Sequence, residues 1–175
     1  NSSASTLEGT QFADTITGGS GSDTITGGAG ADTLTGGSGD DTFQFASGAD
    51  LSGDSSVSGG VGEDTIVFTS AASDIDDADF SGVSDVEAIT LADGGNTVVL
   101  GANASGSGID SITGGTGADD ITGSAAAETI TGGAGADTLT GGSGDDTIIA
   151  EDTDTVDGGA GNDTVEYDAA VDSSD

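Results

Sequence analysis

A single apolar residue recurs every nine positions through most of the chain, and small or polar residues fill the places between. Three consecutive copies in residues 18–44 read GGSGSDTIT, GGAGADTLT and GGSGDDTFQ, with Ile25, Leu34 and Phe43 at the eighth position. The last three residues of each copy predict a short strand that turns its middle side chain inward. The six residues before them are rich in Gly and predict a turn, because Gly adopts backbone conformations closed to residues with a Cβ atom. The pattern therefore predicts stacked turn–strand units around a thin apolar core.

The copies form two blocks, residues 1–67 and residues 105–175. The copies of the second block keep a length of nine residues apart from an eight-residue copy at 150–157. Residues 24–42 and 129–147 share one identical sequence, TITGGAGADTLTGGSGDDT, at an offset of 105 residues. Because this offset is not a multiple of nine, we interpret it as a second level of repetition with a unit of about 105 residues, which is typical of repeat arrays.

Residues 68–104 lie between the blocks and lack the Gly-rich turns. Strands are predicted at 86–90 and 96–102, around an ADGG turn, and Ile89 and Val98 keep the nine-residue spacing. We therefore expect the stack to continue here as a solenoid or insert segment without metal loops. The whole chain is expected to form one continuous elongated domain of about nine or ten rungs, roughly 45 Å long at about 4.8 Å per rung.

The charge of the chain restricts how it can fold. The 175 residues include 33 acidic side chains and no Lys, Arg or His, for a net charge of −33. Two carboxylates about 5 Å apart repel by roughly 0.8 kcal/mol even in water. Summed over a compact body, this repulsion would exceed a typical stability of about 5–15 kcal/mol. The composition alone favours disorder, whereas the sustained nine-residue period favours a fold that is neutralised by cations bound from solution.

The sixth position of the copies supplies a carboxylate at a fixed distance from the Gly residues. Turn carbonyls and carboxylates, in a chain without His or Cys, suit a hard cation, and Ca²⁺ with its 6–8 oxygen ligands fits better than Mg²⁺. We therefore predict several bound Ca²⁺ ions. The candidate carboxylates are those of Asp14, Asp23, Asp32, Asp41, Asp64, Asp110, Asp119, Glu128, Asp137, Asp146, Asp154 and Asp163. The candidate backbone carbonyls are those of Gly18, Gly19, Gly21, Gly27, Gly28, Gly30, Gly36, Gly37, Gly39, Gly114, Gly115, Gly117, Gly132, Gly133, Gly135, Gly141, Gly142 and Gly144. The fifth-position residues Asp40 and Asp145 and the acidic cluster at 74–79 are expected to face solvent.

The repeat GGxGxDxUx, in which U is apolar, resembles the nonapeptide of the RTX (repeats-in-toxin, hemolysin-type calcium-binding) family over about two-thirds of the chain. The character of the chain is closest to RTX-containing bacterial surface-layer, adhesin or matrix proteins. The resemblance implies an all-β fold, a right-handed parallel β-roll (β-solenoid) with two nonapeptides per rung, and Ca²⁺ between turns stacked eighteen residues apart.

The resemblance also implies which carboxylates share an edge of the roll. In the first block Asp14 pairs with Asp32 on one edge, and Asp23 pairs with Asp41 on the other. In the second block one edge carries Asp110, Glu128, Asp146 and Asp163, and the other carries Asp119, Asp137 and Asp154. Three departures are expected to leave weak or empty sites: the turn at 123–128 lacks its second and fourth Gly, the region 149–157 is one residue short, and Ser55 replaces a carboxylate.

Catalysis lacks its usual groups, since the chain has no His, Cys or Lys as base or nucleophile and no Arg to hold an anion. Paired carboxylates could serve a glycosidase, but here the metal uses them. The charge excludes nucleic acid and anionic membranes as partners, and no segment approaches the roughly 20 apolar residues of a membrane span. We therefore expect no enzyme.

Two interpretations of function remain open. The first is an extracellular or cell-surface, bacterial-type secreted structural protein, a Ca²⁺-loaded rod that associates end to end into a filament, surface layer or matrix. The alternative is the RTX region of a larger toxin, protease or lipase whose Ca²⁺-triggered folding assists type I secretion. An effector domain before the repeats and an export signal after them are expected of that alternative, and the sequence shows neither.

The outward-facing Thr pairs that flank the apolar positions form predicted ladders. Such ladders resemble ice-binding surfaces or offer hydroxyls for glycans, although Thr is also simply a good strand residue. Asn1, Asn103 and Asn162 each begin an N-x-S/T triplet, a weak signal for glycosylation.

Overall fold

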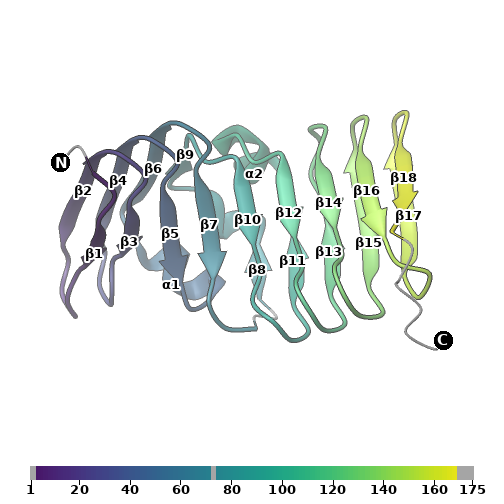
Figure 1. Cartoon of the computed structure of the whole chain (residues 1–175), viewed down its shortest axis with the longest axis horizontal. Helices are drawn as coiled ribbons and strands as arrows, with labels where there is room; N and C mark the ends of the chain where they lie inside the picture. The colour runs from purple at the N-terminus through teal and green to yellow at the C-terminus, as the bar shows by residue number, and fades with distance from the viewer. Residues whose placement is uncertain (1–2, 72–73, 169–175) are drawn as a thin grey trace.

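The computed structural model describes residues 3–71 and 74–168, and it consists mainly of short parallel strands stacked along one axis (Figure 1). Each full turn of the chain, here called a rung, contributes a strand to one face and, with one exception described below, a single strand to the opposite face. One face is a nine-stranded sheet of β1 (Thr6–Glu8), β3 (Thr24–Thr26), β5 (Thr42–Phe45), β7 (Thr65–Phe68), β10 (Ala88–Thr90), β12 (Ser111–Thr113), β14 (Thr129–Thr131), β16 (Thr147–Ala150) and β18 (Thr164–Tyr167). The predicted parallel β-roll is confirmed.

The second face is divided into two sheets. The four-stranded sheet contains β2 (Thr15–Ser20), β4 (Thr33–Ser38), β6 (Ser56–Val61) and β9 (Val83–Ser84). The five-stranded sheet contains β8 (Ile75–Asp76), β11 (Thr97–Val99), β13 (Asp120–Thr122), β15 (Thr138–Ser143) and β17 (Thr155–Ala160). Strands β8 and β9 lie in one turn of the chain, where β9 pairs back to β6 and β8 pairs forward to β11.

The strand register counts the residues in each rung. In the first block Ile16 pairs with Leu34 and Ile25 pairs with Phe43, so a rung holds eighteen residues, or two nonapeptides. In the middle of the chain Phe43 pairs with Ile66, which pairs with Ile89, and these rungs hold twenty-three residues.

Three consecutive rungs have this greater length, and each contains one short helix. The helices are α1 (Gly48–Gly53), the 3₁₀ helix η1 (Asp77–Phe80) and α2 (Ala102–Ser107). The lengths also account for the offset of 105 residues between the identical segments. The segments begin in β3 and β14, which lie five rungs apart, and two of those rungs hold eighteen residues and three hold twenty-three.

The core is a single file of apolar side chains between the two faces, as the nine-residue pattern predicts. Ile25, Leu34 and Ile130 are completely buried, and each contributes the one inward side chain of its strand. Around the helices the core is thicker, because Phe68 and Phe80 are buried there as well. Residues near the ends of the stack, such as Leu7, Ile16 and Val156, are only partly buried.

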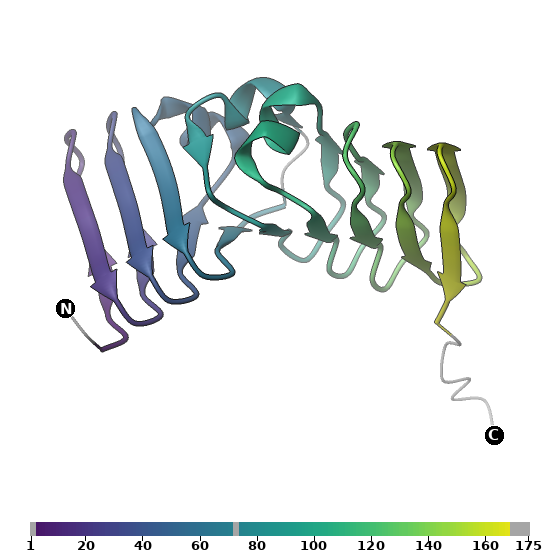
Figure 2. The same ribbon diagram turned by 90° about the horizontal axis from the view of Figure 1, so that it is seen from above.

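The helices coincide with a bend in the stack. Figure 2 shows the two halves of the roll inclined to one another, with the helices on the outer side of the bend. The extra residues of the long rungs lie on this outer side, where the second face is divided between β9 and β8. The bend thus lies at the three longer rungs of the middle segment.

Candidate metal centre

The turns of neighbouring rungs stack with their backbones in close contact. Gly37 and Gly39, at the second and fourth positions of one turn, have φ angles of 118° and 109°, which residues with a Cβ rarely adopt. A Cβ atom at Gly37 would also collide with the carbonyl oxygen of Gly19 in the preceding rung. Gly is therefore required both by the curl of the turn and by the close approach of the next one.

One oxygen of most sixth-position carboxylates accepts a backbone N–H from the preceding rung. The N–H of Asp14 donates to Asp32 Oδ1 at 2.8 Å, and the N–H of Asp23 donates to Asp41 Oδ1 at 2.7 Å. The same bond joins Asp41 to Asp64, Asp119 to Asp137, Glu128 to Asp146, Asp137 to Asp154 and Asp146 to Asp163. These bonds form two ladders of carboxylates along the edges of the roll.

In most of these aspartates a carboxylate oxygen is buried without a hydrogen-bond donor, whereas Asp154 Oδ2 accepts the N–H of Glu151 at 2.7 Å. Seven aspartates have at least one buried carboxylate oxygen without a partner: Asp23, Asp32, Asp41, Asp64, Asp119, Asp137 and Asp146. All seven side chains are at most 2% exposed. The sequence contains no Lys, Arg or His that could approach them. Because burial of an unpaired carboxylate costs much free energy, a cation bound from solution is expected to stabilise these oxygens.

The unpaired oxygens lie beside the first Gly of each turn. A Cβ atom at Gly18 would stand 2.5 Å from Asp23 Oδ2 and 2.7 Å from the carbonyl oxygen of Gly36 in the next rung. The same cradle recurs at Gly141, where Asp146 Oδ2 and the Gly158 carbonyl approach. A carboxylate and a carbonyl oxygen thus converge on a space that only Gly leaves open, and this all-oxygen set fits Ca²⁺.

Burial shifts the titration of these acids. Burial is the main cause that raises the pKa of Asp64 to about 6, and the neighbouring carboxylates of Asp41 and Glu87 contribute to this value. Burial likewise raises the pKa values of Asp41, Asp137 and Glu128 above their ordinary values. The raised pKa values and the unpaired oxygens have the same origin, because these buried carboxylates have no positively charged group beside them.

The predicted ligands are not all arranged alike. Asp110 is exposed, and its N–H donates to the carbonyl of Glu87 rather than to a carboxylate. The structure therefore does not join Asp110 to Glu128 by the bond that links the other pairs. In the irregular turn at 123–128, both the N–H and the hydroxyl of Ser124 bind the carboxylate of Glu128, so this carboxylate is partly satisfied by its own turn.

Two carboxylates occupy the ladder without having been predicted. The N–H of Asp64 donates to Glu87 Oε2 at 2.7 Å, and the N–H of Asp32 donates to Asp54 Oδ1 at 3.1 Å. Glu87 lies two residues before the core residue Ile89. Every sixth-position acid has this spacing from the apolar residue of its copy, so the spacing could have identified Glu87. Asp54, the C-cap residue of α1, takes the place in the ladder that the nine-residue spacing assigns to Ser55.

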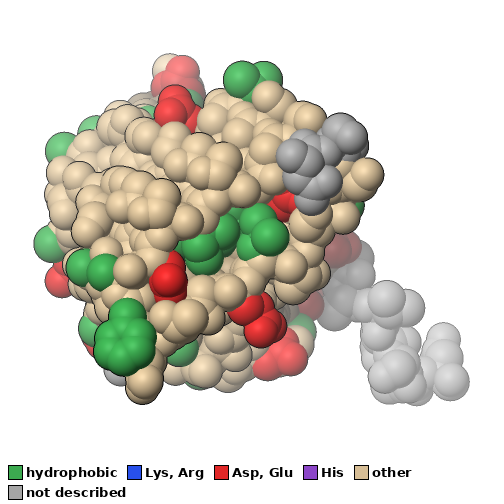
Figure 3. Space-filling model, turned by 90° about the vertical axis from the view of Figure 1, so that its left-hand side faces the viewer, with side chains coloured by type: hydrophobic (Ala, Val, Ile, Leu, Met, Phe, Trp, Pro, Cys, Tyr) green, Lys and Arg blue, Asp and Glu red, His purple; other side chains and the backbone are tan. Residues whose placement is uncertain are grey.

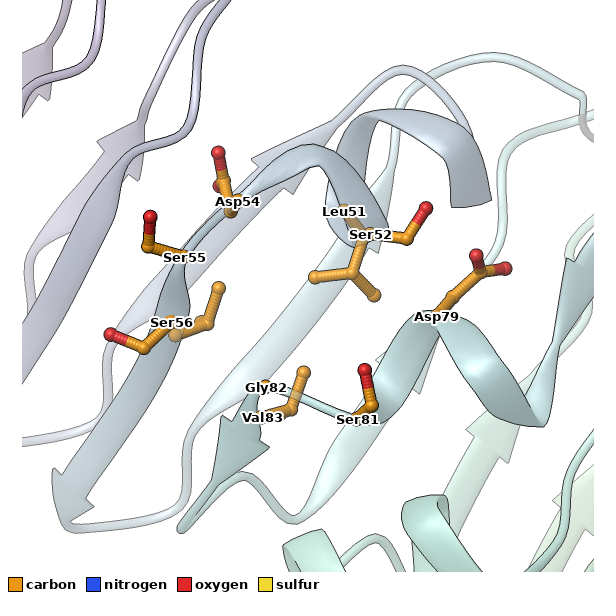
Figure 4. A pocket seen from close by; sticks show the side chains of 10 residues that line it. Leu51, Ser52, Asp54, Ser55, Ser56, Asp79, Ser81, Gly82 and Val83 are labelled. Atoms are coloured by element: carbon orange, nitrogen blue, oxygen red, sulfur yellow. The ribbon is translucent and has the colours of Figure 1, made fainter.

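A cavity of about 180 Å³ lies between α1 and η1 (Figure 4). Its carboxylates, Asp54 and Asp79, point to different sides and do not converge on one ligand. Asp79 Oδ2 accepts the N–H of Asp76 as part of the cap of η1. No group of three or more metal-binding side chains gathers anywhere in the described part of the chain. Within the described residues, it is in the stacked turns that carbonyl oxygens lie beside buried carboxylates.

Comparison with known proteins identifies the repeat. A family model of the RTX calcium-binding nonapeptide repeat, which spans four copies, matches residues 8–43, 105–139, 122–152, 131–165 and 150–172. These matches cover more than half of the chain. No curated protein matches it. Within residues 3–71 and 74–168, none of the helices has the length and apolar character needed to cross a membrane.

Proposed function

Because the chain belongs to the RTX calcium-binding nonapeptide repeat family, we propose that it is an extracellular structural rod, held folded by several Ca²⁺ ions, that associates end to end into a filament, surface layer or matrix. Residues 1–67 and 105–175 are its calcium-loaded blocks, and residues 68–104 are its metal-poor middle. The observation that carries the proposal is the series of seven buried aspartates whose oxygens have no donor in a chain without cationic side chains.

The sixth-position carboxylates and the carbonyl of the first Gly in the next turn would hold each ion. The ion supplies positive charge between stacked turns that otherwise repel one another. Since the stacked turns exist only in the folded chain, binding and folding are coupled. The side chains themselves provide no base or nucleophile beyond carboxylates, and RTX repeats are a structural calcium-binding unit that is not catalytic by itself.

End-to-end association is supported by the two end surfaces of the rod. The outermost strands are β1 and β2 at one end and β17 and β18 at the other, and each pairs on one side only among the described residues. Figure 3 shows hydrophobic side chains in the middle of the first end and acidic side chains around them. At the other end Val165 and Tyr167 are 40% and 58% exposed.

The sequence has no Lys or Pro with which sheet edges are commonly protected. Contact between two different end surfaces does not close on itself, so it extends into a filament. Ca²⁺ at the junction would bridge two acidic ends that otherwise repel.

Light scattering and electron microscopy of the 175-residue chain in about millimolar Ca²⁺ test the proposal. We expect rods or fibres that grow with protein concentration. A Val165→Lys variant should shorten them, because the substitution places a charge on the end strand β18, whereas Val61→Lys, at a 72% exposed position in β6, should not. A stable monomer at high concentration would end the filament proposal, and discrete small particles that fold with Ca²⁺ would favour the secretion-module alternative.

A further inference from the structure

Asn96 occupies a place in the ladder where the regular copies have a carboxylate. Strands β11 and β13 pair Thr97 with Asp120, so the preceding residues Asn96 and Asp119 are neighbours in successive rungs. The backbone N–H of Asn96 donates to Asp119 Oδ1 at 2.7 Å, which is the bond that links the sixth-position residues elsewhere. The position therefore belongs to the metal ladder, although its side chain is an amide.

The side chain of Asn96 is 2% exposed and directs its amide nitrogen into its own turn. Nδ2 donates to the carbonyl oxygens of Ala92 at 2.9 Å and Gly94 at 2.7 Å, and to Asp119 Oδ1 at 2.7 Å. Ala92 and Gly94 stand at the second and fourth positions of the nonapeptide 91–99. These are positions whose carbonyls are candidate metal ligands in the regular turns.

The turn of Asn96 differs from a regular turn in the hydrogen-bond donors that its sixth-position side chain provides. An ionised Asp has only acceptors, and its buried Oδ2 has no partner in seven of the turns. An Asn amide has two N–H donors, so it can satisfy turn carbonyls and a neighbouring carboxylate at once. Asn96 thus brings partial positive charge to a group of two carbonyls and one carboxylate, which is the kind of oxygen set that takes Ca²⁺ elsewhere in the roll.

We propose that the side-chain amide of Asn96 replaces a calcium ion in its turn, so that the step from Asn96 to Asp119 is stable without metal, and that an aspartate at this position would create a new calcium site. Asp119 itself remains a ligand of the following step, because its Oδ2 is buried without a donor. The proposal rests on the calcium sites of the proposed function.

The decisive experiment counts bound Ca²⁺ by native mass spectrometry for the wild type and for Asn96→Asp. We expect the variant to bind one more ion per chain than the wild type. Asn162→Asp is the matched control, because it makes the same substitution at an exposed fifth position and should leave the count unchanged. An unchanged count in a folded Asn96→Asp variant would overturn the proposal. Absence of Ca²⁺ from the wild type would instead overturn the proposed sites, and the Asn96 proposal with them.

Hydrogen exchange supplies a readout that does not depend on counting. At limiting Ca²⁺, backbone exchange in residues 91–99 of Asn96→Asp should be roughly tenfold or more faster than in the wild type, because the turn then contains an uncompensated buried charge. At saturating Ca²⁺ the difference should disappear. Equal exchange at limiting Ca²⁺ would contradict the proposal.

A converse pair of variants covers the case in which Asn96→Asp does not fold. In Asp137→Asn the new amide can donate to its turn carbonyls, whereas Asp137→Ala offers no donor. Both variants should bind fewer Ca²⁺ ions than the wild type, but exchange in residues 132–140 should remain slow only in Asp137→Asn. Equally fast exchange in the two variants would show that an amide does not substitute for the ion.

Discussion

Removal of Ca²⁺ should unfold the roll, and the structure allows the size of the effect to be estimated. Seven buried aspartates each have at least one oxygen without a donor. An unsatisfied buried polar group costs about 1–3 kcal/mol, and a charged one costs more. Seven such groups therefore cost at least roughly 7–20 kcal/mol, which matches or exceeds the whole stability of a typical domain, about 5–15 kcal/mol.

Bound Ca²⁺ reverses this balance. A site occupied at about a thousand times its dissociation constant adds about 4 kcal/mol to the free energy of unfolding. Several such sites together offset the cost of the buried acids, so we expect folding to follow Ca²⁺ concentration steeply.

Far-ultraviolet circular dichroism during a Ca²⁺ titration is the assay. The spectrum should change from coil to β between roughly micromolar and millimolar Ca²⁺. Equal concentrations of Mg²⁺ should be much less effective, because Mg²⁺ demands a stricter geometry and retains its waters. Sodium chloride at matched ionic strength controls for simple screening of the repulsion. A β spectrum that persists in excess chelator at about pH 7 would refute the reasoning, since the ionised buried acids would then be tolerated without a cation.

Three further predictions concern single positions and pH. Asp32→Ala should reduce the number of bound Ca²⁺ ions measured by native mass spectrometry, because Asp32 is completely buried and has an unpaired carboxylate oxygen. Asp40→Ala, at an exposed position, should leave the number unchanged, and equal losses in the two variants would mean that the ladder positions are assigned wrongly. Gly141→Ala should raise the Ca²⁺ concentration needed for folding by about tenfold or more, since a Cβ would enter the cradle between a carboxylate and a carbonyl, and a dichroism titration identical to that of the wild type would count against the cradle. Burial raises the pKa of Asp64 to about 6 in the metal-free roll, above its ordinary value of 3.8. Protonation of Asp64 therefore stabilises the metal-free fold fully below its ordinary pKa, and this stabilisation is lost as the pH rises through about 6. As the pH falls from about 7 to about 5, chelated protein should gain β structure and the Ca²⁺ concentration at the folding midpoint should rise; a midpoint independent of pH would contradict this.

Much of the fold could be predicted because the regular rungs repeat the same local sequence pattern. An apolar residue such as Ile25 or Leu34 marks the inward strand position, and Gly at fixed offsets marks the turn. The strand register follows once two nonapeptides are assigned to a rung, and the carboxylate pairs Asp14–Asp32 and Asp23–Asp41 then lie next to one another as expected.

The long rungs could not be predicted from the repeat because their extra residues obey different rules. The helix α1 begins at a serine cap, where Ser47 accepts the N–H of Asp50, and this local signal does not reveal that the surrounding chain still completes a rung. Glu87 and Asn96 were missed as ladder members because their turns lack the Gly pattern, although both precede an apolar strand residue by the usual two positions. Alignment on the core residue, rather than on Gly, is the better guide in such segments.

The roll thus stabilises its rungs in two ways, and their distribution along the chain has a consequence for folding. A regular rung buries only one apolar side chain per strand, so it depends on cations to hold its acidic turns together. The middle rungs add the buried aromatic side chains of Phe68 and Phe80, and the amide of Asn96 donates to carbonyls of its own turn, so we expect these rungs to depend less on cations. Because each rung gains stability from the neighbours on which it stacks, growth of the fold outward from this middle segment avoids the step that is most expensive for an acidic repeat, the formation of a first rung with no neighbour and no bound ion.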